Sequence, residues 1–410
     1  MKKIFFVALA ATLLAASCQK TEIINPVNPT GQPALSFSTG MSKLTKAFPN
    51  GAKSDADSDG MVNLKAQDFR VWAYADYEDP NTTKDELDQI YDGMSNLNIA
   101  YNEVDAKDNE GKDIKVGSWA PAKEYYWPGV GKNLRFFAVS GVALGDDLSA
   151  TTKVTPTVTR TTTVVKPDDT TTPDVNEEVT ETTVASQLTV TDFVVNHESP
   201  NADLMVADFV CQNQTTKEVS LKFRHALSKV EFLFNTLANS DATVYVQSLS
   251  VENVLTKSSL TVTENNGDDK VTKPTIFTWG DRSVPQTFVD DYTATANVPT
   301  DTEKLVANAD LDNTALELTT TATNFCTWLV MPQTISTLQV KIIYVIGKRQ
   351  FESIFPLGTE ALTAWGANQY VRYTITLAPN KISFTPSVEE WDQYDADSET
   401  TGNQDITMQN

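Results

Sequence analysis

The stretch Val219–Phe234, which reads VSLKFRHALSKVEFLF, decides the fold. Val219, Leu221 and Phe223 alternate with polar residues, as in a strand with one buried face. After His225 the apolar residues move to the opposite parity. Such a shift would turn every side chain to the other face unless the strand bulges, bends or passes into a second sheet. We therefore expect a β-sandwich corner here, with the His225 ring hydrogen-bonding across it.

The rest of the chain has the same strand-like character. Apolar residues alternate with polar ones in several runs, for example over residues 69–74 and 371–377, whereas a helical pattern occurs only near residues 84–91. A chain of 410 residues is longer than one core usually supports. The sequence therefore predicts an all-β protein with two domains and few short helices.

Residues 150–185 form an insert rich in Thr and Val. Both residue types favour strands, so the arms Val154–Val165 and Val179–Val190 are expected to pair as a projecting hairpin. A disordered, mucin-like stalk is the alternative. Because the arms carry little apolar surface, we expect deletion of residues 151–183 to leave both domains folded.

The first residues are typical of an export signal. Two lysines, an apolar run and small residues make up residues 1–17, which are too short to span a bilayer. The small residues before Cys18 resemble a lipobox, so we expect lipidation of Cys18 and anchoring to the outer membrane; an ordinary cleavable signal is the alternative. Residues 18–33 contain three prolines and are expected to form an extended tether.

Charge and composition exclude some functions. The formal net charge of −22 repels a phosphate backbone, which excludes nucleic acid as a partner. His197 and His225 lie in no nucleophile or metal-ligand pattern, so no enzyme and no cofactor are expected. Cys211 and Cys326 could form a disulfide, but separate burial as small apolar residues is the stronger interpretation.

Two patterns suggest binding sites. Asp55, Asp57 and Asp59 match the first half of a calcium loop, but Ala66 replaces the bidentate Glu at the twelfth position, so a solvated turn is the stronger interpretation. A second group of residues could form a glycan platform, although core packing is the commoner role of aromatic residues in strands. This aromatic group consists of Trp72, Tyr74, Tyr125, Tyr126 and Trp127.

The segments Asp203–Ala207 and Val219–Val230 resemble the junction motif of the fimbrillin family, the lipoprotein pilins of type V pili. The resemblance implies two transthyretin-like antiparallel β-sandwich domains, at residues 34–212 and 213–391, followed by a polar tail at 392–410. It implies a stalk, tip or anchor subunit on the cell surface, with other pilin subunits as partners and a host receptor or glycan as a further one. Thr170 lies in a triplet that resembles an acceptor for O-glycosylation.

The resemblance also implies a maturation step. Pilins of this family are cleaved after an Arg that follows the first strand, but here the matching site reads Thr45-Lys46-Ala47. Cleavage between Lys46 and Ala47 would remove the strand that carries Leu35 and Phe37 and open a groove for a neighbour's strand. An uncut chain would suit an anchor role, and a monomeric glycan-binding lipoprotein is the competing hypothesis.

The donor strand is expected in the C-terminal region. Its candidate residues are Ile382, Phe384 and Val388, which alternate along one strand-like run. The alternative is that these three residues belong to the last strand of their own domain.

Overall fold

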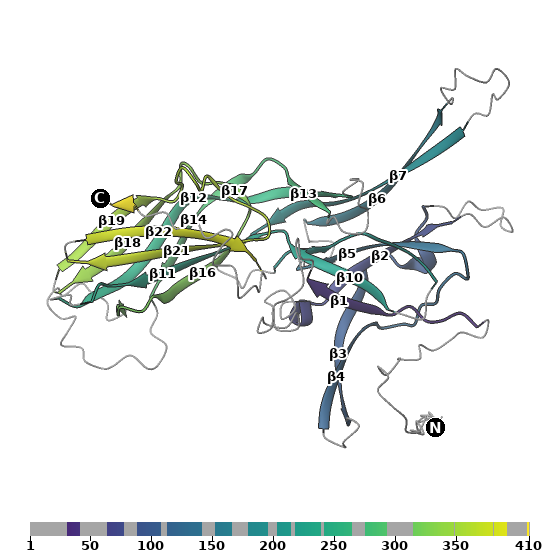
Figure 1. Cartoon of the computed structure of the whole chain (residues 1–410), viewed down its shortest axis with the longest axis horizontal. Coiled ribbons are helices and arrows are strands. Elements are labelled where there is room, and N and C mark those ends of the chain that lie inside the picture. Colours follow the sequence, from purple (N-terminus) through teal and green to yellow (C-terminus); the bar gives the residue numbers. More distant parts are fainter. Residues whose placement is uncertain are drawn as a thin grey trace, which may run out of the picture.

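The computed structural model describes residues 31–41, 64–77, 88–107, 113–141, 152–165, 179–195, 203–214, 218–238, 242–264, 275–292, 315–347, 349–379, 381–391 and 408–409. These residues confirm the all-β class: besides strands they hold one helical turn over 64–67 and one 3-10 turn, η2 (Tyr91–Gly93). Two β bodies lie end to end, and two strand ribbons project from them (Figure 1).

The N-terminal body is a closed barrel of seven strands rather than the expected two-sheet sandwich. The order around it is β2, β3, β4, β1, β10, β8, β5, and β5 pairs again with β2. Closure removes the exposed edges that an open sheet would leave. β1 and β10 run parallel, so the body is not purely antiparallel. The bounds are β1 Phe37–Met41, β2 Phe69–Asp76, β3 Leu97–Lys107, β4 Asp113–Pro121, β5 Asn133–Ser140, β8 Met205–Ala207, β9 Val210–Asn213, which extends the pairing on β5, and β10 Val219–His225.

The C-terminal body is a sandwich of two sheets, but it is not purely antiparallel as expected, because β11 and β21 run parallel. One sheet has the order β16, β11, β21, β22, β23, and the other β19, β18, β12, β7, β6. Side chains from both sheets form one core, where Phe355 of β19 stacks on Phe384 of β22 at 5.8 Å between ring centres. The bounds are β6 Lys153–Val165, β7 Val179–Val194, β11 Ser228–Asn235, β12 Val244–Thr263, β13 Ile276–Trp279, β14 Ser283–Asp291, β15 Leu316–Glu317, β16 Thr323–Val330, β17 Gln333–Thr334, β18 Gln339–Ile346, β19 Arg349–Pro356, β20 Ala364–Trp365, β21 Gln369–Ala378, β22 Lys381–Glu390 and β23 Met408–Gln409.

The parity shift after His225 marks the passage between the two bodies. β10 lies in the barrel, and β11, which starts three residues after His225, lies in the sandwich. Val219, Leu221 and Phe223 are buried in the barrel core, whereas Val230 and Phe232 are buried in the sandwich core. The shift is therefore a change of sheet. The sequence placed β10 in the second domain, at 213–391, whereas in the structure β10 pairs with β1 and β8 and completes the barrel.

The Thr-rich insert forms the expected hairpin, with a ladder from Lys153↔Thr191 to Val165↔Val179. It is not a separable surface insertion, however. β7 also pairs with β12, and its residues Leu188 and Val190 are fully buried in the sandwich core. β6 and β7, the Thr-rich ribbon, are thus strands of the C-terminal body that continue outward (Figure 1).

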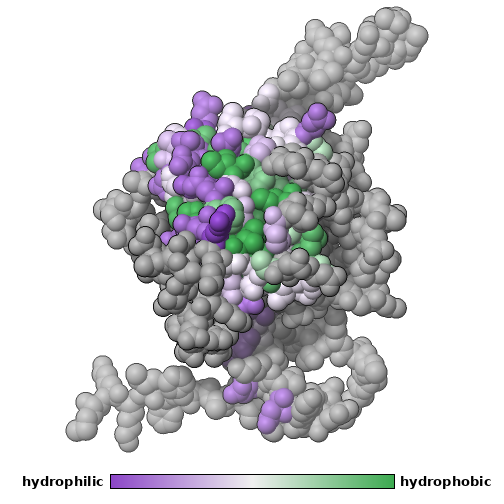
Figure 2. Space-filling model, turned by 90° about the vertical axis from the view of Figure 1, so that its left-hand side faces the viewer, coloured by the Kyte–Doolittle hydropathy of each residue, from purple (hydrophilic) through white to green (hydrophobic). Residues whose placement is uncertain are grey.

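The end of the sandwich remote from the barrel exposes hydrophobic side chains among hydrophilic ones (Figure 2). Leu237, which follows β11, is 40% exposed. Between β18 and β19, Gly347 adopts a φ of 59°, which suits the short turn of a hairpin.

Candidate functional site

The first strand is an internal strand of the barrel. β1 pairs in parallel with β10 from Phe37↔Val219 to Met41↔Phe223, and it pairs with β4 only at Phe37↔Trp119. Just before the strand, the Leu35 N–H donates to the carbonyl of Tyr125 at 2.7 Å. β1 is therefore held by backbone bonds on both sides, although its pairing with β4 is short.

The side chains of the first strand fill the barrel core. Leu35 and Met41 are each 5% exposed, and Phe37 is 1% exposed. The Phe37 ring meets Phe136 edge to face at 6.0 Å and Phe69 at 6.4 Å between ring centres. Burying three such side chains is worth about 5–9 kcal/mol, which is comparable to the whole stability of a typical domain.

Removal of β1 would therefore leave a slot rather than a relaxed barrel. Neighbouring strands lie about 4.8 Å apart, so β4 and β10 would face each other across roughly 10 Å with their backbone groups unpaired. The floor of the slot would consist of the aromatic rings that now surround Phe37. A strand with alternating apolar side chains would fit this slot. Its backbone would pair with β4 and β10, and its apolar side chains would cover the aromatic rings.

The expected donor residues lie in a different setting. Ile382, Phe384 and Val388 belong to β22, which pairs with β21 over its full length, from Gln369↔Glu390 to Ala378↔Lys381. Phe384 is 1% exposed, and the other two are partly buried against the sandwich core. In this structure β22 is the last long strand of its own body, as the alternative expectation stated, and the two-residue strand β23 pairs with it.

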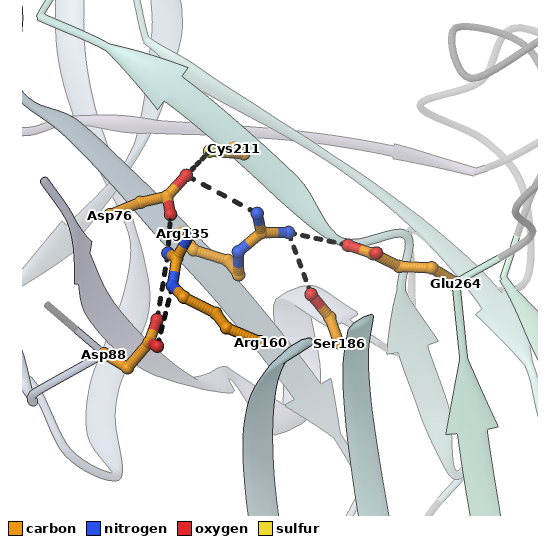
Figure 3. A network of polar contacts seen from close by, with 7 residues as sticks. All are labelled: Asp76, Asp88, Arg135, Arg160, Ser186, Cys211 and Glu264. Carbon is orange, nitrogen blue, oxygen red and sulfur yellow. Dashed lines mark hydrogen bonds and ion pairs between the residues drawn. The ribbon is translucent and has the colours of Figure 1, made fainter. Parts of the chain in front are cut away.

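A partly buried polar network joins the Thr-rich ribbon to the barrel (Figure 3). Arg160 of β6 pairs with Asp76 at the end of β2 and donates to Asp88 from Nε at 2.8 Å. Arg135 of β5 donates to Glu264, which follows β12, at 2.7 Å, and it also pairs with Asp76 at 3.4 Å. We call this set the Asp76 network; Ser186 of β7 and Cys211 of β9 complete it.

The charges in this network set the pKa of Asp76. Burial raises this pKa, but hydrogen bonds from the Cys211 thiol and Arg160, together with the charges of Arg135 and Arg160, outweigh the effect. The pKa of Asp76 therefore lies below its ordinary value of 3.8. Burial and the bond to Asp76 raise the pKa of Cys211 to about 12, so this thiol acts as a donor and not as a nucleophile.

The sequence interpretation missed the Asp76 network, although one signal was present. Arg160 is the only charged residue among the Thr and Val residues of the first arm, at 154–165. A lone arginine in such a strand needs a carboxylate partner once it is partly buried. Asp76 and Asp88, which supply it, are more than 70 residues away in the chain.

Several expected sites can be compared with the structure. Trp72, Tyr125 and Trp127 are at most 7% exposed, so core packing is confirmed for these aromatic residues and a glycan platform built on them is not supported. Cys211 and Cys326 are free thiols; Cys326 is buried as expected, whereas Cys211 is exposed. Cys18, Lys46, Ala47, Asp55, Asp57, Asp59 and Thr170 lie outside the described residues.

The described part of the chain lacks two features, one for metal-ion binding and one for membrane crossing. No group of three His, Cys, Asp or Glu side chains in this part is placed to hold a metal ion. Within the same residues, no helix has the length and apolar character needed to cross a membrane.

Comparison with known proteins gives a family match. A family model described as fimbrillin-like matches residues 63–391. Among solved structures, a candidate cell adhesion protein from Bacteroides uniformis aligns with 14% identity and a TM-score of 0.42, covering 89% of this chain and 99% of that one. A fimbrial assembly protein from Parabacteroides distasonis aligns with 11% identity and a TM-score of 0.30, covering 84% and 99%. No curated protein matches the chain.

Proposed function

Because the chain belongs to the fimbrillin-like family, we propose that it is a structural subunit of a cell-surface type V pilus and assembles by strand exchange. One observation carries this proposal. The strand that precedes Lys46 is an internal strand of a closed barrel, and its buried side chains include Leu35 and Phe37. A protein that loses this strand must either take up another strand or expose its core.

The proposed maturation step is cleavage between Lys46 and Ala47. β1 ends at Met41, so a cut after Lys46 would leave β10 and β4 in place and would release the whole first strand. The Lys side chain keeps the positive charge of the family's Arg but lacks its planar guanidinium. A subunit that is not cut keeps β1 and its lipid on Cys18, and it would then serve as the anchor at the outer membrane.

The in vitro experiment compares two purified forms of the chain. One form starts at Gln19 and keeps β1, and the other starts at Ala47 and lacks it. We expect the Ala47 form to give ladders on a denaturing gel that resist boiling, because an exchanged strand becomes part of a core. The Gln19 form should stay monomeric. Monomeric behaviour of both forms, with the barrel folded, would contradict strand exchange.

The cellular experiment determines which residue is the N-terminal one in the surface-exposed protein. Ala47 as the first residue supports cleavage, whereas an acylated Cys18 on assembled protein supports the anchor role. A Lys46→Gln variant should stop cleavage, and Lys43→Gln provides a matched control three residues away. In the same cells, Cys18→Ala should release the protein from the membrane fraction, because stable anchoring requires more than one acyl chain.

A further inference from the structure

A buried polar pair at the passage between the two bodies has no part in the proposed strand exchange. The Nδ1 atom of His225 lies 2.8 Å from Oδ2 of Asp203, and both side chains are at most 1% exposed. Groups of this kind are costly to bury unless they are paired. The end of β5 packs directly against this site, because a Cβ on Gly141 would lie 1.9 Å from the Asp203 carbonyl oxygen. The pair is therefore enclosed within the protein.

The His225 ring packs against Trp391, the residue that directly follows β22. Trp391 follows β22 directly and is 4% exposed. Its ring stacks on the His225 ring with 3.5 Å between centres and 8° between planes. Asp203 fixes the orientation of the imidazole through the Nδ1 contact, so it also fixes the surface against which the indole lies. Asp203 is thus a positioning residue for Trp391.

Asn368 connects the same site through backbone bonds. Its carbonyl accepts the Trp391 N–H at 2.8 Å, and its own N–H donates to the Leu227 carbonyl at 3.0 Å. Its side-chain oxygen accepts the His225 N–H at 3.3 Å. Asn368 adopts a φ of 59°, a conformation that Asn tolerates better than most residues. The end of β10, the passage to β11, the start of β21 and the end of β22 are all joined here.

We infer that Asp203, His225, Asn368 and Trp391, the crossover cluster, hold the end of β22 at the junction of the two bodies and keep it as a resident strand. The crossover cluster keeps β22 in its own sheet whether or not the subunit polymerises. It follows that the apolar residues of β22 stay in their own sandwich during assembly, because withdrawal of β22 would require Trp391 to leave a closed site.

Hydrogen exchange on the full chain tests this inference. In the native protein, those amides of residues 387–390 at the end of β22 that bond to β21 should exchange as slowly as the amides of β11. In Trp391→Leu they should exchange at least tenfold faster, while β11 stays protected. Asp203→Ala should have the same local effect, and Asp203→Asn, whose amide oxygen can still accept the His225 Nδ1–H, should have a smaller one.

The matched control is Tyr370→Phe. Tyr370 pairs with Glu389 in the β21–β22 ladder but is not part of the crossover cluster, so this variant should leave the exchange of residues 387–390 unchanged. Equal acceleration across β11, β21 and β22 in Trp391→Leu would show a general loss of stability and would overturn the inference. Unchanged protection of β22 would overturn it as well. Should Trp391→Leu fold poorly, Trp391→Phe keeps an aromatic ring on His225 and should give an intermediate rate.

Discussion

The first and last long strands of this protein, β1 and β22, are both buried, but they are attached in different ways. Phe37 of β1 and Phe384 of β22 are each 1% exposed. β1 has five residues, and only Phe37 pairs with β4. β22 has ten residues, all paired with β21, and Trp391 holds its end in the crossover cluster. We therefore propose that the length of the ladder and the attachment of the strand's end, rather than burial, decide which strand can be exchanged.

The strongest test of this comparison removes β1 entirely. Before any strand is exchanged, a monomeric chain that starts at Ala47 should lack the cooperative thermal transition of the barrel, because about 5–9 kcal/mol of apolar burial is missing. The transition of the sandwich should remain. Adding a peptide of residues 33–41 should restore the barrel transition, as measured by calorimetry. A peptide with Leu35→Ser and Phe37→Ser is the control. If this control peptide also restored the barrel transition, the slot would not select for apolar side chains.

The second prediction concerns the Thr-rich ribbon. Deletion of residues 151–183 removes β6 and part of β7, together with Arg160 and the hydrogen bond from the Tyr74 hydroxyl to the Pro156 carbonyl. We expect a loss of about 2–4 kcal/mol in the free energy of unfolding, since a partly buried ion-pair network is broken on one side. This revises the expectation from the sequence, which treated the insert as dispensable.

The matched control for that deletion shortens only the connection. Replacing residues 166–178 by Asn-Gly joins Val165 to Val179, which already pair, through a two-residue turn that suits a hairpin. Urea unfolding of this variant should stay within about 0.5 kcal/mol of the native chain. A large loss in the control, or none in the full deletion, would contradict the integral role of the ribbon.

The ribbon also shows how much of the fold the sequence could predict. The strand propensity of Thr and Val predicted both arms of the hairpin, and the parity shift after His225 predicted a corner at which the chain bulges, bends or changes sheet. Periodicity specifies which face of a strand is buried but not its partner strand. The parallel pairing of β1 with β10 and the closure of the barrel through β2 and β5 join residues far apart in the chain, so they could not be read from local patterns.

The same limit applied to the candidate sites. Leu35 and Phe37 were identified because apolar alternation near the start of the chain marks a buried strand. The Asp76 network and the crossover cluster depend on contacts between distant segments, such as the contact between Asp203 and His225 and the stacking of His225 on Trp391. The sequence predicted a hydrogen bond of the His225 ring across the corner, but it identified neither Asp203 nor Trp391 as a partner.

A third prediction is a double-mutant cycle within the Asp76 network, which ties the ribbon to the barrel. Asp76→Asn and Arg160→Gln should each cost about 1–3 kcal/mol near pH 6.5, with a coupling energy of about 1–2 kcal/mol. Because the pKa of Asp76 is lower in the folded state than its ordinary 3.8, the network stabilises the protein above that pH. The stabilisation should disappear as the pH falls through the folded-state pKa.

Urea unfolding at a series of pH values measures this dependence. The difference between the native chain and Asp76→Asn should be largest near neutral pH and should shrink below pH 4. Asp105→Asn, at an exposed position of β3, is the matched control and should show no comparable pH dependence. A difference that grows toward low pH would contradict the assignment of Asp76 as the ionised partner.

The smallest expected effect comes from the outer face of the sandwich, next to β22. Arg372 of β21 donates to Glu231 of β11 at 2.7 Å, and its guanidinium lies 4.7 Å from the centre of the Tyr370 ring. The Arg372 side chain is 38% exposed, so solvent screens the ion pair. Arg372→Gln should therefore cost only about 0.2–1 kcal/mol in urea unfolding, and less at high salt.

This small effect distinguishes two explanations for the retention of β22. Arg372 pairs directly with Ser387 of β22, so a contribution of outer-face charges to retention should appear as faster exchange of β22 amides in Arg372→Gln. If the inward rings and the crossover cluster hold the strand, exchange should be unchanged in this variant. Tyr373→Leu should then accelerate it, because Tyr373 stacks on Phe384 inside the core at 5.1 Å. Faster exchange in Arg372→Gln, equal to that in Tyr373→Leu, would mean that the outer face and the core contribute alike, and the contrast between β1 and β22 would then depend on ladder length alone.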